Sequence, residues 1–325
     1  MLLTRTPLRI SLGGGGSDLP SYYQDHGGFF VSAAIDKYIY IGINQTFNKK
    51  YFIRYQQQEL VDRSIDIKHP LVREAVTAHD PGPVEVVSLA DIPSGTGLGS
   101  SGSFTVGLLR TLYAYNRSSV SPAMLAEEAC NIEINRLKEP VGKQDQYIAA
   151  FGGLQSFEVN RSGTVTAEPL KLSQSTLHDL EDHLLLFFTG YSRSASAILS
   201  DQKLKSENSD RKMVSNLQSI VEIGRESKSV LERGETKLFA SLMHQHWLRK
   251  RERSVGMSND SIDRWYSKGI ANGALGGKVV GAGGGGFLMF YAKDNHGLRA
   301  AMTEEGLDEI RFKFDFDGST VIARG

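Results

Sequence analysis

The chain has 325 residues, which at ~150 residues per domain favours two domains. Lys plus Arg and Asp plus Glu number 37 each, so no overall charge attracts the protein to nucleic acid or to an acidic membrane surface. Any anionic ligand must therefore be held by a local site. Cys130 is the only cysteine, which excludes an intramolecular disulfide and a thiolate metal cluster and indicates a reducing compartment.

We expect no segment for entry into a membrane. It begins MLLTRTPLRI, without the long apolar run and small-residue cleavage site of a secretory signal. Apolar runs such as residues 184–188 are far shorter than the ~20 residues that span a bilayer. We therefore predict a cytoplasmic protein whose partners include no membrane and no nucleic acid.

The first half of the chain is predicted to combine strands with two helices. Runs rich in Ile, Val, Tyr and Phe, with Gly, Pro or Asp near their ends, predict strands at residues 8–12, 29–35, 38–43 and 84–89. After Gly102 the apolar spacing favours a buried helix. A second helix is predicted from Pro122 to about Leu137, with Pro122 in its first turn after Ser121. Another strand is predicted at residues 154–159.

The second half is predicted to contain fewer strands and longer helices. The predicted elements are a strand at 183–188, a long polar helical region at 194–232, a helix at 236–251 and an alternating closing strand at 312–316. Strands and helices in this order predict an α+β fold with two domains. We place the division near residue 170, which gives domains at 1–170 and 171–325.

The sharpest local pattern is IPSGTGLGSSGSF at residues 92–104. Three of its glycines let the backbone approach a ligand closely and adopt positive φ: Gly95, Gly97 and Gly99. The helix that follows offers unpaired N–H groups and the positive end of its dipole, so the segment predicts a polyphosphate cradle. Three hydroxyls could bind phosphate oxygens or Mg²⁺: Ser100, Ser101 and Ser103. The segment lacks the Gly-Lys-Ser/Thr of a Walker A loop, and a flexible connection is the alternative.

A second glycine-rich segment, LRISLGGGGSDLP, occupies residues 8–20. Four consecutive glycines after a strand are entropically unfavourable, which indicates that a surface without side chains is required there. Arg9 is a permanent cation suited to phosphate oxygens, and Asp18 is an acceptor suited to sugar hydroxyls. A helix N-cap or an Asx-turn is the alternative for Asp18, and spacing alone favours it.

The third segment, GGKVVGAGGGGFLMF, occupies residues 276–290. Its glycines lie in an apolar context, which indicates a turn pressed against another backbone or a ligand. A tight hairpin is the competing explanation.

Two carboxylates lie in IEINRLKEPVGKQDQYIAAFGG at residues 132–153. Beside a phosphate cradle, Glu133 at a helix end and Asp145 on the following turn could divide the work between holding Mg²⁺ and orienting or deprotonating an attacking hydroxyl. Each could also be a solvated surface acid, with Glu133 paired with Arg136 or Lys138.

These segments resemble, in order, the three motifs of the galactokinase, homoserine kinase, mevalonate kinase and phosphomevalonate kinase (GHMP) superfamily. PLRISLGGGGSD is similar to the first motif, PSGTGLGSSGS to the second and KVVGAGGGGF to the third. RTPLRISLGGGGSDLPSYY, AAIDKYIYIGI, EPVGKQDQYIAAFGG and LLLFFTGYSRSASAIL look most similar to the D-glycero-D-manno-heptose 7-phosphate kinases. The resemblance implies an N-terminal ribosomal-protein-S5-like domain, which binds nucleotide and magnesium, and a C-terminal ferredoxin-like domain.

The resemblance also implies ATP and Mg²⁺ as cofactors and assigns roles to residues. Asp145 matches the proposed catalytic base, Arg9 the residue that polarises the acceptor hydroxyl, and Ser101 and Glu133 the Mg²⁺ ligands. The nucleotide-binding positions are Pro93, Gly95, Gly97, Leu98, Gly99, Ser100, Ser101, Gly102 and Ser103. The substrate-binding positions are Gly15, Gly16, Ser17, Asp18, Arg193, Gly283 and Gly284.

A phosphorylated acceptor requires an anion site of its own. Residues 189–194, TGYSRS, join a predicted strand to a helix start and carry hydroxyls, backbone donors and Arg193. We expect an anion site here, and the alternative is a capped helix with a solvent-facing Arg193.

The sequence therefore predicts an ATP-dependent kinase that phosphorylates the anomeric hydroxyl of D-glycero-D-manno-heptose 7-phosphate. Galactokinases carry Gly-Glu-His-Thr-Asp in the first motif, whereas this chain lacks the Glu and His, and mevalonate kinases usually have Lys in place of Arg9. The alternatives are a GHMP kinase for another sugar such as fucose and a non-catalytic nucleotide- or sugar-binding regulator. Retention of Ser101, Glu133 and Asp145 favours the enzyme. The assembly state is open, with a homodimer as one candidate.

Overall fold

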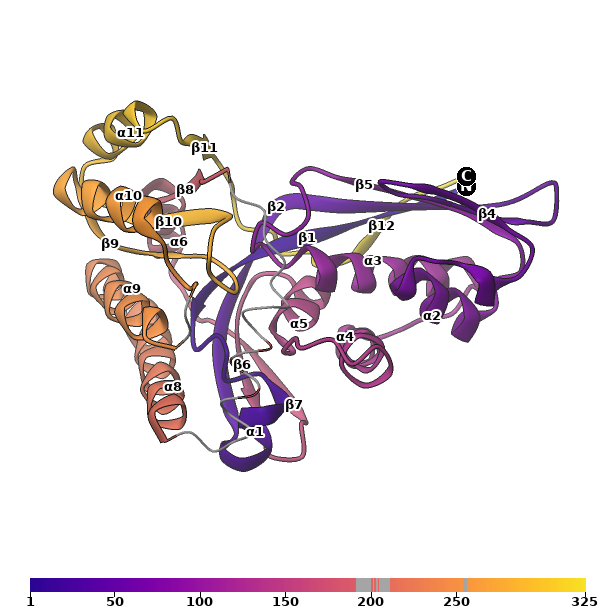
Figure 1. Ribbon diagram of the computed structural model, residues 1–325, viewed down its shortest axis with the longest axis horizontal. Coiled ribbons are helices and arrows are strands. Elements are labelled where there is room, and N and C mark those ends of the chain that lie inside the picture. Colours follow the sequence, from indigo (N-terminus) through magenta and orange to yellow (C-terminus); the bar gives the residue numbers. More distant parts are fainter. Residues whose placement is uncertain (191–199, 201, 203, 205–210, 254–255) are drawn as a thin grey trace.

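Two β-sheets organise the protein. The computed structural model describes residues 1–190, 200, 202, 204, 211–253 and 256–325 (Figure 1). In this part of the chain the larger sheet contains β1 (Leu2–Gly13), β2 (Gly28–Gln45), β3 (Tyr51–Arg54), β4 (Gln58–Val61), β5 (Val84–Ala90), β6 (Leu154–Val159), β7 (Val165–Pro169) and β12 (Thr320–Arg324). The smaller sheet has the order β11-β8-β10-β9, with β8 (Leu184–Phe188), β9 (Ala274–Val279), β10 (Phe287–Ala292) and β11 (Asp308–Ile310).

Helices cover both sheets. The first half contains α1 (Pro20–His26), a 3₁₀ turn (Ser64–Asp66), α2 (Pro70–His79), α3 (Ser100–Tyr115), α4 (Pro122–Cys130), a π-helical turn (Asn131–Arg136) and α5 (Gln144–Phe151). The second half contains α6 (Gln174–His183), α8 (Arg211–Glu232), α9 (Thr236–Arg251), α10 (Asp260–Ala271) and α11 (Asn295–Glu304). In Figure 1, α3 and α5 lie beneath the larger sheet, while α8 and α9 flank it at the left and α9 packs on β9.

The sheets change between Pro169 and Leu184, close to the division predicted at residue 170. The last strand nevertheless pairs with β1, with Leu2 opposite Arg324. One hydrophobic cluster also includes residues from both sheets, such as Ile10 of β1 and Met289 of β10. The α+β architecture is confirmed, and the two parts of the chain share a core.

Two strand predictions are corrected. The strands expected at 29–35 and 38–43 form the single strand β2, because a bulge opposite Pro7 and Leu8 absorbs the break in alternation. The strand expected at 312–316 is absent, and only an isolated bridge joins Phe314 to Ile35. Its alternation reflects burial of Phe312 and Phe314 against the core rather than membership of a sheet.

The helix predicted at 122–137 is α4 followed by the π-helical turn. Ser121 caps α4 by accepting a hydrogen bond from the backbone N–H of Met124 at 3.2 Å, as expected for a serine before Pro122. The sequence did not predict α5, which places Asp145 in the first turn of a helix instead of a loop.

The third glycine segment is a hairpin whose loop is pressed against the second segment. The loop joins β9 to β10, and Val280 and Gly281 lie against Gly97. Gly97 has a φ of 85°, and a Cβ there would lie 2.5 Å from the carbonyl oxygen of Val280. The segment is therefore both a hairpin and a turn pressed against another backbone, as the two explanations proposed.

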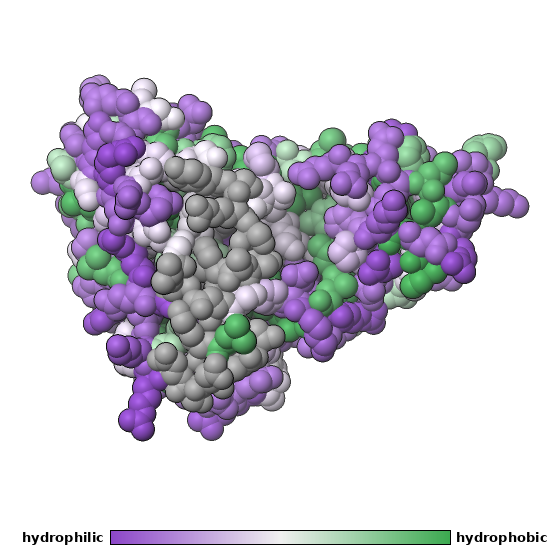
Figure 2. Space-filling view, viewed as in Figure 1, coloured by the Kyte–Doolittle hydropathy of each residue, from purple (hydrophilic) through white to green (hydrophobic). Residues whose placement is uncertain are grey.

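The surface is largely polar where the helices of the second half face solvent. Figure 2 shows hydrophilic residues over α8 and α9, with apolar residues in smaller groups towards the opposite end. Among the described residues, no helix combines the length and apolar character needed to cross a bilayer.

Candidate active site

The glycine loop at residues 95–99 opens directly into α3. Gly99 precedes the helix with a φ of 79°, and no side chain caps the first backbone N–H groups. The backbone N–H of Arg9 donates to the carbonyl of Leu98 at 3.0 Å, which fixes the loop against β1. The start of α3 therefore presents unpaired donors and the positive end of its dipole to an anionic ligand.

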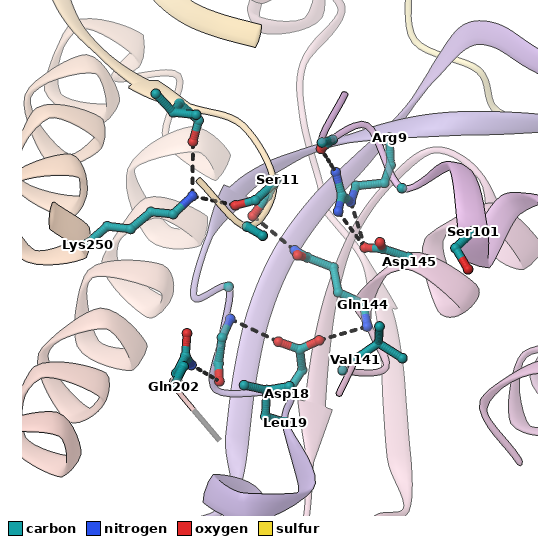
Figure 3. A pocket seen from close by; sticks show the side chains of 18 of the residues that line it. Arg9, Ser11, Asp18, Leu19, Ser101, Val141, Gln144, Asp145, Gln202 and Lys250 are labelled. Atoms are coloured by element: carbon teal, nitrogen blue, oxygen red, sulfur yellow. Dashed lines mark hydrogen bonds and ion pairs between the residues drawn. The ribbon is translucent and has the colours of Figure 1, made fainter. Parts of the chain in front are cut away.

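Arg9 and Asp145 form an ion pair beside this loop (Figure 3). Nε and Nη2 of Arg9 each lie 2.7 Å from Oδ1 of Asp145, and Nη1 donates to the carbonyl of Gly97. Arg9 is buried, while 28% of the Asp145 side chain is exposed. Oδ2 of Asp145 has no hydrogen bond to a described residue, so the carboxylate retains an acceptor for a ligand.

Asp145 contacts the glycine-rich loop and the start of α3 in addition to its ion pair with Arg9. A Cβ placed on Gly102 would lie 2.7 Å from Cβ of Asp145, and one on Gly99 would lie 3.2 Å from its Cγ. The glycines at these positions therefore allow the acid to sit against the helix that offers the phosphate donors.

Glu133 lies behind Ser101. Ser101 Oγ donates to Glu133 Oε2 at 2.6 Å, and Gln146 Nε2 donates to Glu133 Oε1 at 2.9 Å. Burial raises the pKa of Glu133, and the negative charge of Asp145 adds to that rise, although both hydrogen bonds oppose it. The glutamate is carried by the π-helical turn, a distortion that occurs frequently at functional sites.

The pair of Ser101 and Glu133 suits a Mg²⁺ ion. Magnesium takes one or two protein oxygens and completes its shell with water and substrate phosphates. Within the described chain no three His, Cys, Asp or Glu side chains group together, so a cage built only from protein is not available there. A cation beside Glu133 would offset the unfavourable burial of its carboxylate.

Asp18 is a buried carboxylate beside the start of α5. Its Oδ1 accepts from the N–H of Gly16 at 2.9 Å, and Oδ2 accepts from the N–H of Gln144 at 3.0 Å. Burial raises the pKa of Asp18 despite these bonds, which favour the charged form. Asp18 therefore joins the first glycine segment to the start of the helix that carries Asp145. It is not the N-cap of the following helix, because Leu19 holds that position in α1 without a side-chain cap.

One cleft of about 180 Å³ collects most of the predicted site residues. It is lined by Arg9, Gly15, Gly16, Asp18, Gly95, Gly97, Gly99, Ser100, Ser101 and Asp145. We call the face built from Arg9, residues 95–101 and Asp145 the loop wall. Figure 3 shows Arg9, Asp145 and Ser101 together on this side of the cleft.

Other predicted nucleotide-binding residues lie beside the cleft without lining it. Leu98 is fully buried, and Ser103 is buried with its hydroxyl donating to the carbonyl of Pro7 at 2.8 Å. Gly102 packs on Asp145, and Pro93 is exposed. Leu98 and Ser103 therefore direct their side chains into the core and to a backbone carbonyl.

Several predicted substrate-binding residues also have other contacts. The buried hydroxyl of Ser17 lies 2.8 Å from the carbonyl of Gly14 and 2.9 Å from that of Phe29. Gly283 packs against Met257, and the N–H of Gly284 donates to the Met257 carbonyl at 2.9 Å. Arg193 lies outside the described residues.

The opposite face of the cleft carries side chains that sequence reasoning missed. We call it the basic wall: His246, Lys250, Arg253 and Lys278. The first three follow one another by four and three positions, so one side of α9 and the turn after it face the cleft. That spacing is present in the sequence. Lys278 is brought in by β9, and only the tertiary fold reveals it.

The two-sheet fold and the glycine-rich loop at the uncapped start of α3 indicate a phosphotransferase. Known proteins agree: the GHMP kinases N terminal domain matches residues 65–153, and the GHMP kinases C terminal region matches residues 227–306. The chain belongs to the GHMP kinase superfamily and is an ATP-dependent sugar kinase.

Individual relatives cover nearly the whole chain. A D-glycero-alpha-D-manno-heptose 7-phosphate kinase of Campylobacter jejuni is 29% identical over 319 residues, which cover 93% of this chain and 94% of that protein. A solved putative sugar kinase from Campylobacter jejuni has a TM-score of 0.76 at 26% identity, covering 99% and 98% of the two chains. A solved D-glycero-D-manno-heptose 1-phosphate kinase from Bacteroides thetaiotaomicron has a TM-score of 0.83 at 24% identity, with 100% coverage of both chains.

Proposed function

We propose that this kinase transfers the γ-phosphoryl group of ATP to the anomeric C1 hydroxyl of D-glycero-D-manno-heptose 7-phosphate. The products are the 1,7-bisphosphate and ADP. The observation that carries the proposal is the ion pair of Arg9 and Asp145 set against the open start of α3. The choice of heptose is supported by the Campylobacter jejuni relative, whose similarity extends over nearly both full chains.

The loop wall would hold the triphosphate through backbone donors. The N–H groups at the start of α3 have no side-chain cap, and they would receive the phosphate oxygens. Ser101 and Glu133 would hold Mg²⁺, which when bound would neutralise charge on the phosphates during transfer.

Asp145 would act on the acceptor hydroxyl. The hydroxyl oxygen forms a bond to the γ-phosphorus as the bond to the bridging β,γ-oxygen breaks, and the hydroxyl proton passes to the Asp145 carboxylate. An anomeric hydroxyl is more acidic than an ordinary alcohol, so orientation by Asp145 contributes alongside proton removal. Arg9, held by Asp145 and the Gly97 carbonyl, would stabilise charge on the transferred group.

Coupled ADP release with a panel of acceptors tests the proposal. We expect the highest kcat/KM for heptose 7-phosphate, and the phosphorylated product should carry the new group at C1. The panel also contains the unphosphorylated heptose, heptose 1-phosphate and fucose. A higher kcat/KM for any of these would overturn the assigned acceptor, and ATP binding without ADP release for every sugar would favour a non-catalytic regulator.

A further inference from the structure

The basic wall concentrates positive charge in a buried place. His246, Lys250, Arg253 and Lys278 are 2%, 6%, 5% and 1% exposed. Burial lowers the pKa of Lys250 and of His246 well below their usual values, and mutual repulsion of the cations adds to both shifts. Burial also lowers the pKa of Lys278 to about 7, with repulsion from Arg9 and Arg253. Such a wall is unfavourable unless an anion enters the cleft.

Carboxylates of the cleft offset this wall only in part. Asp145 is paired with Arg9, and the charge of Asp18 favours the charged form of Arg253. No ion pair within 4.0 Å joins Lys250 or Lys278 to a carboxylate of the described part of the chain. The positive charge therefore exceeds the negative charge among the described residues that line the cleft.

Hydrogen bonding on the wall is also incomplete. Lys250 donates to the carbonyls of Val279, at 3.1 Å, and Gly281. Lys278 Nζ instead has only a long contact of 3.4 Å to Nδ1 of His246 among the described residues. Nε2 of His246 is buried without a hydrogen-bond partner in that part of the structure. Lys278 and His246 are thus placed to donate to an additional acceptor.

We propose that the basic wall is the site for the phosphate monoester of the acceptor, with Lys278 as a principal contact. This inference rests on the proposed function, because it assumes that the acceptor carries a phosphate group. The nucleotide phosphates are served by the loop wall, where α3 begins and Ser101 meets Glu133. An acceptor whose hydroxyl lies at Asp145 can then extend its phosphate towards the opposite wall, where Figure 3 shows Lys250.

The first test compares Lys278→Met with Lys228→Met. Methionine keeps the length and apolar stem of Lys278 but removes its charge, while Lys228 lies on α8 in ion pairs with Glu168 and Glu232. We expect kcat/KM for heptose 7-phosphate to fall about 100-fold in Lys278→Met, with KM for ATP unchanged and the Lys228 variant near wild type. An unchanged kcat/KM, or an equal loss for unphosphorylated heptose, would overturn the assignment.

The second test does not depend on the identity of the sugar. The wild-type protein is saturated with Mg²⁺ and a nonhydrolysable ATP analogue, and inorganic phosphate binding is measured by calorimetry. Binding should be present in wild type and in Lys278→Arg, and lost in Lys278→Met. If the enzyme turns over no heptose but phosphate binding still depends on Lys278 in this way, the anion site is supported. Only the assignment of the acceptor sugar is then overturned. Absent binding in wild type, or equal binding in Lys278→Met, contradicts the site.

Discussion

The two walls of the cleft differ in whether their buried cations are paired with a carboxylate. On the loop wall, Arg9 is matched by Asp145 at 2.7 Å, and the backbone of Gly97 accepts another of its protons. On the basic wall, Lys278 is fully buried and meets only a histidine nitrogen among the described residues. Arg9 on the loop wall thus has a carboxylate partner, whereas Lys278 on the basic wall has no ion pair with a carboxylate of the described chain.

This difference indicates how the work is divided. A matched pair holds its geometry before substrate arrives, which suits groups that must be preorganised for phosphoryl transfer. An unmatched cluster destabilises the free protein but attracts and orients an anion, which suits recognition. Four substitutions can alter these features separately: they remove the carboxylate partner of Arg9, disturb the contact of Gly97 with the β9–β10 loop, remove the charge of Glu133, and remove the charge of Lys278.

The largest effect is expected from Asp145→Asn. The amide cannot accept a proton, and it leaves the buried Arg9 without its carboxylate. We expect kcat to fall by about 10²–10⁴-fold while KM for ATP changes little. Steady-state ADP release measures this, with the exposed Asp25→Asn as the control. A kcat within tenfold of wild type would remove Asp145 from the reaction.

Gly97→Ala should disturb the contact between the loop wall and the β9–β10 loop. The added Cβ would approach the Val280 carbonyl oxygen to 2.5 Å in a backbone with positive φ. We expect the free energy of unfolding to fall by ~2–4 kcal/mol, through strain and displacement of the β9–β10 loop. Gly82→Ala is a matched control, because Gly82 also has positive φ but has open space around it. It should lose only ~1 kcal/mol in denaturant titrations, and similar losses at both positions would argue against a tight contact.

Glu133→Gln should weaken the response to magnesium. The substitution keeps the shape of the side chain but removes the charge that would hold the cation beside Ser101. We expect the Mg²⁺ concentration for half-maximal activity to rise about 10–100-fold. A magnesium titration at saturating ATP measures the shift, and the exposed Glu226→Gln should leave it unchanged. An unaltered titration would place the cation elsewhere.

Lys278→Met should stabilise the free protein by ~1–2 kcal/mol at pH 7, because it removes an unmatched buried cation. The pKa of Lys278 is lowered from 10.5 to about 7 on folding, so the unfolded chain binds more protons between these values. The free energy of unfolding of the wild type therefore rises as the pH increases from about 7 to 10.5. The destabilisation by the buried Lys278 charge is fully present below pH 7. Thermal unfolding at pH 6.5 and 9.5 should show the larger difference at pH 6.5. A variant less stable than wild type would indicate a structural role.

Much of the loop wall could be predicted from sequence because its chemistry is local. Glycines at 95, 97 and 99 imply positive φ, and all three have it. A helix start after them supplies phosphate donors whatever surrounds it. The order of the segments predicted that Asp145 and Glu133 lie near that helix. In the structure Asp145 lies against Gly99 and Gly102, and Glu133 accepts a hydrogen bond from Ser101.

The sequence by itself thus determined the kinase family, the α+β class and the residues of the loop wall, since these depend on backbone conformation and short spacing. Only the tertiary structure decided which side chains reach the cleft. It turned Ser17 and Ser103 towards backbone carbonyls, and it brought Lys278 from β9 to His246 on α9. The physical reason is that side-chain burial and pairing depend on contacts between elements far apart in the chain, whereas glycine conformation and helix dipoles do not.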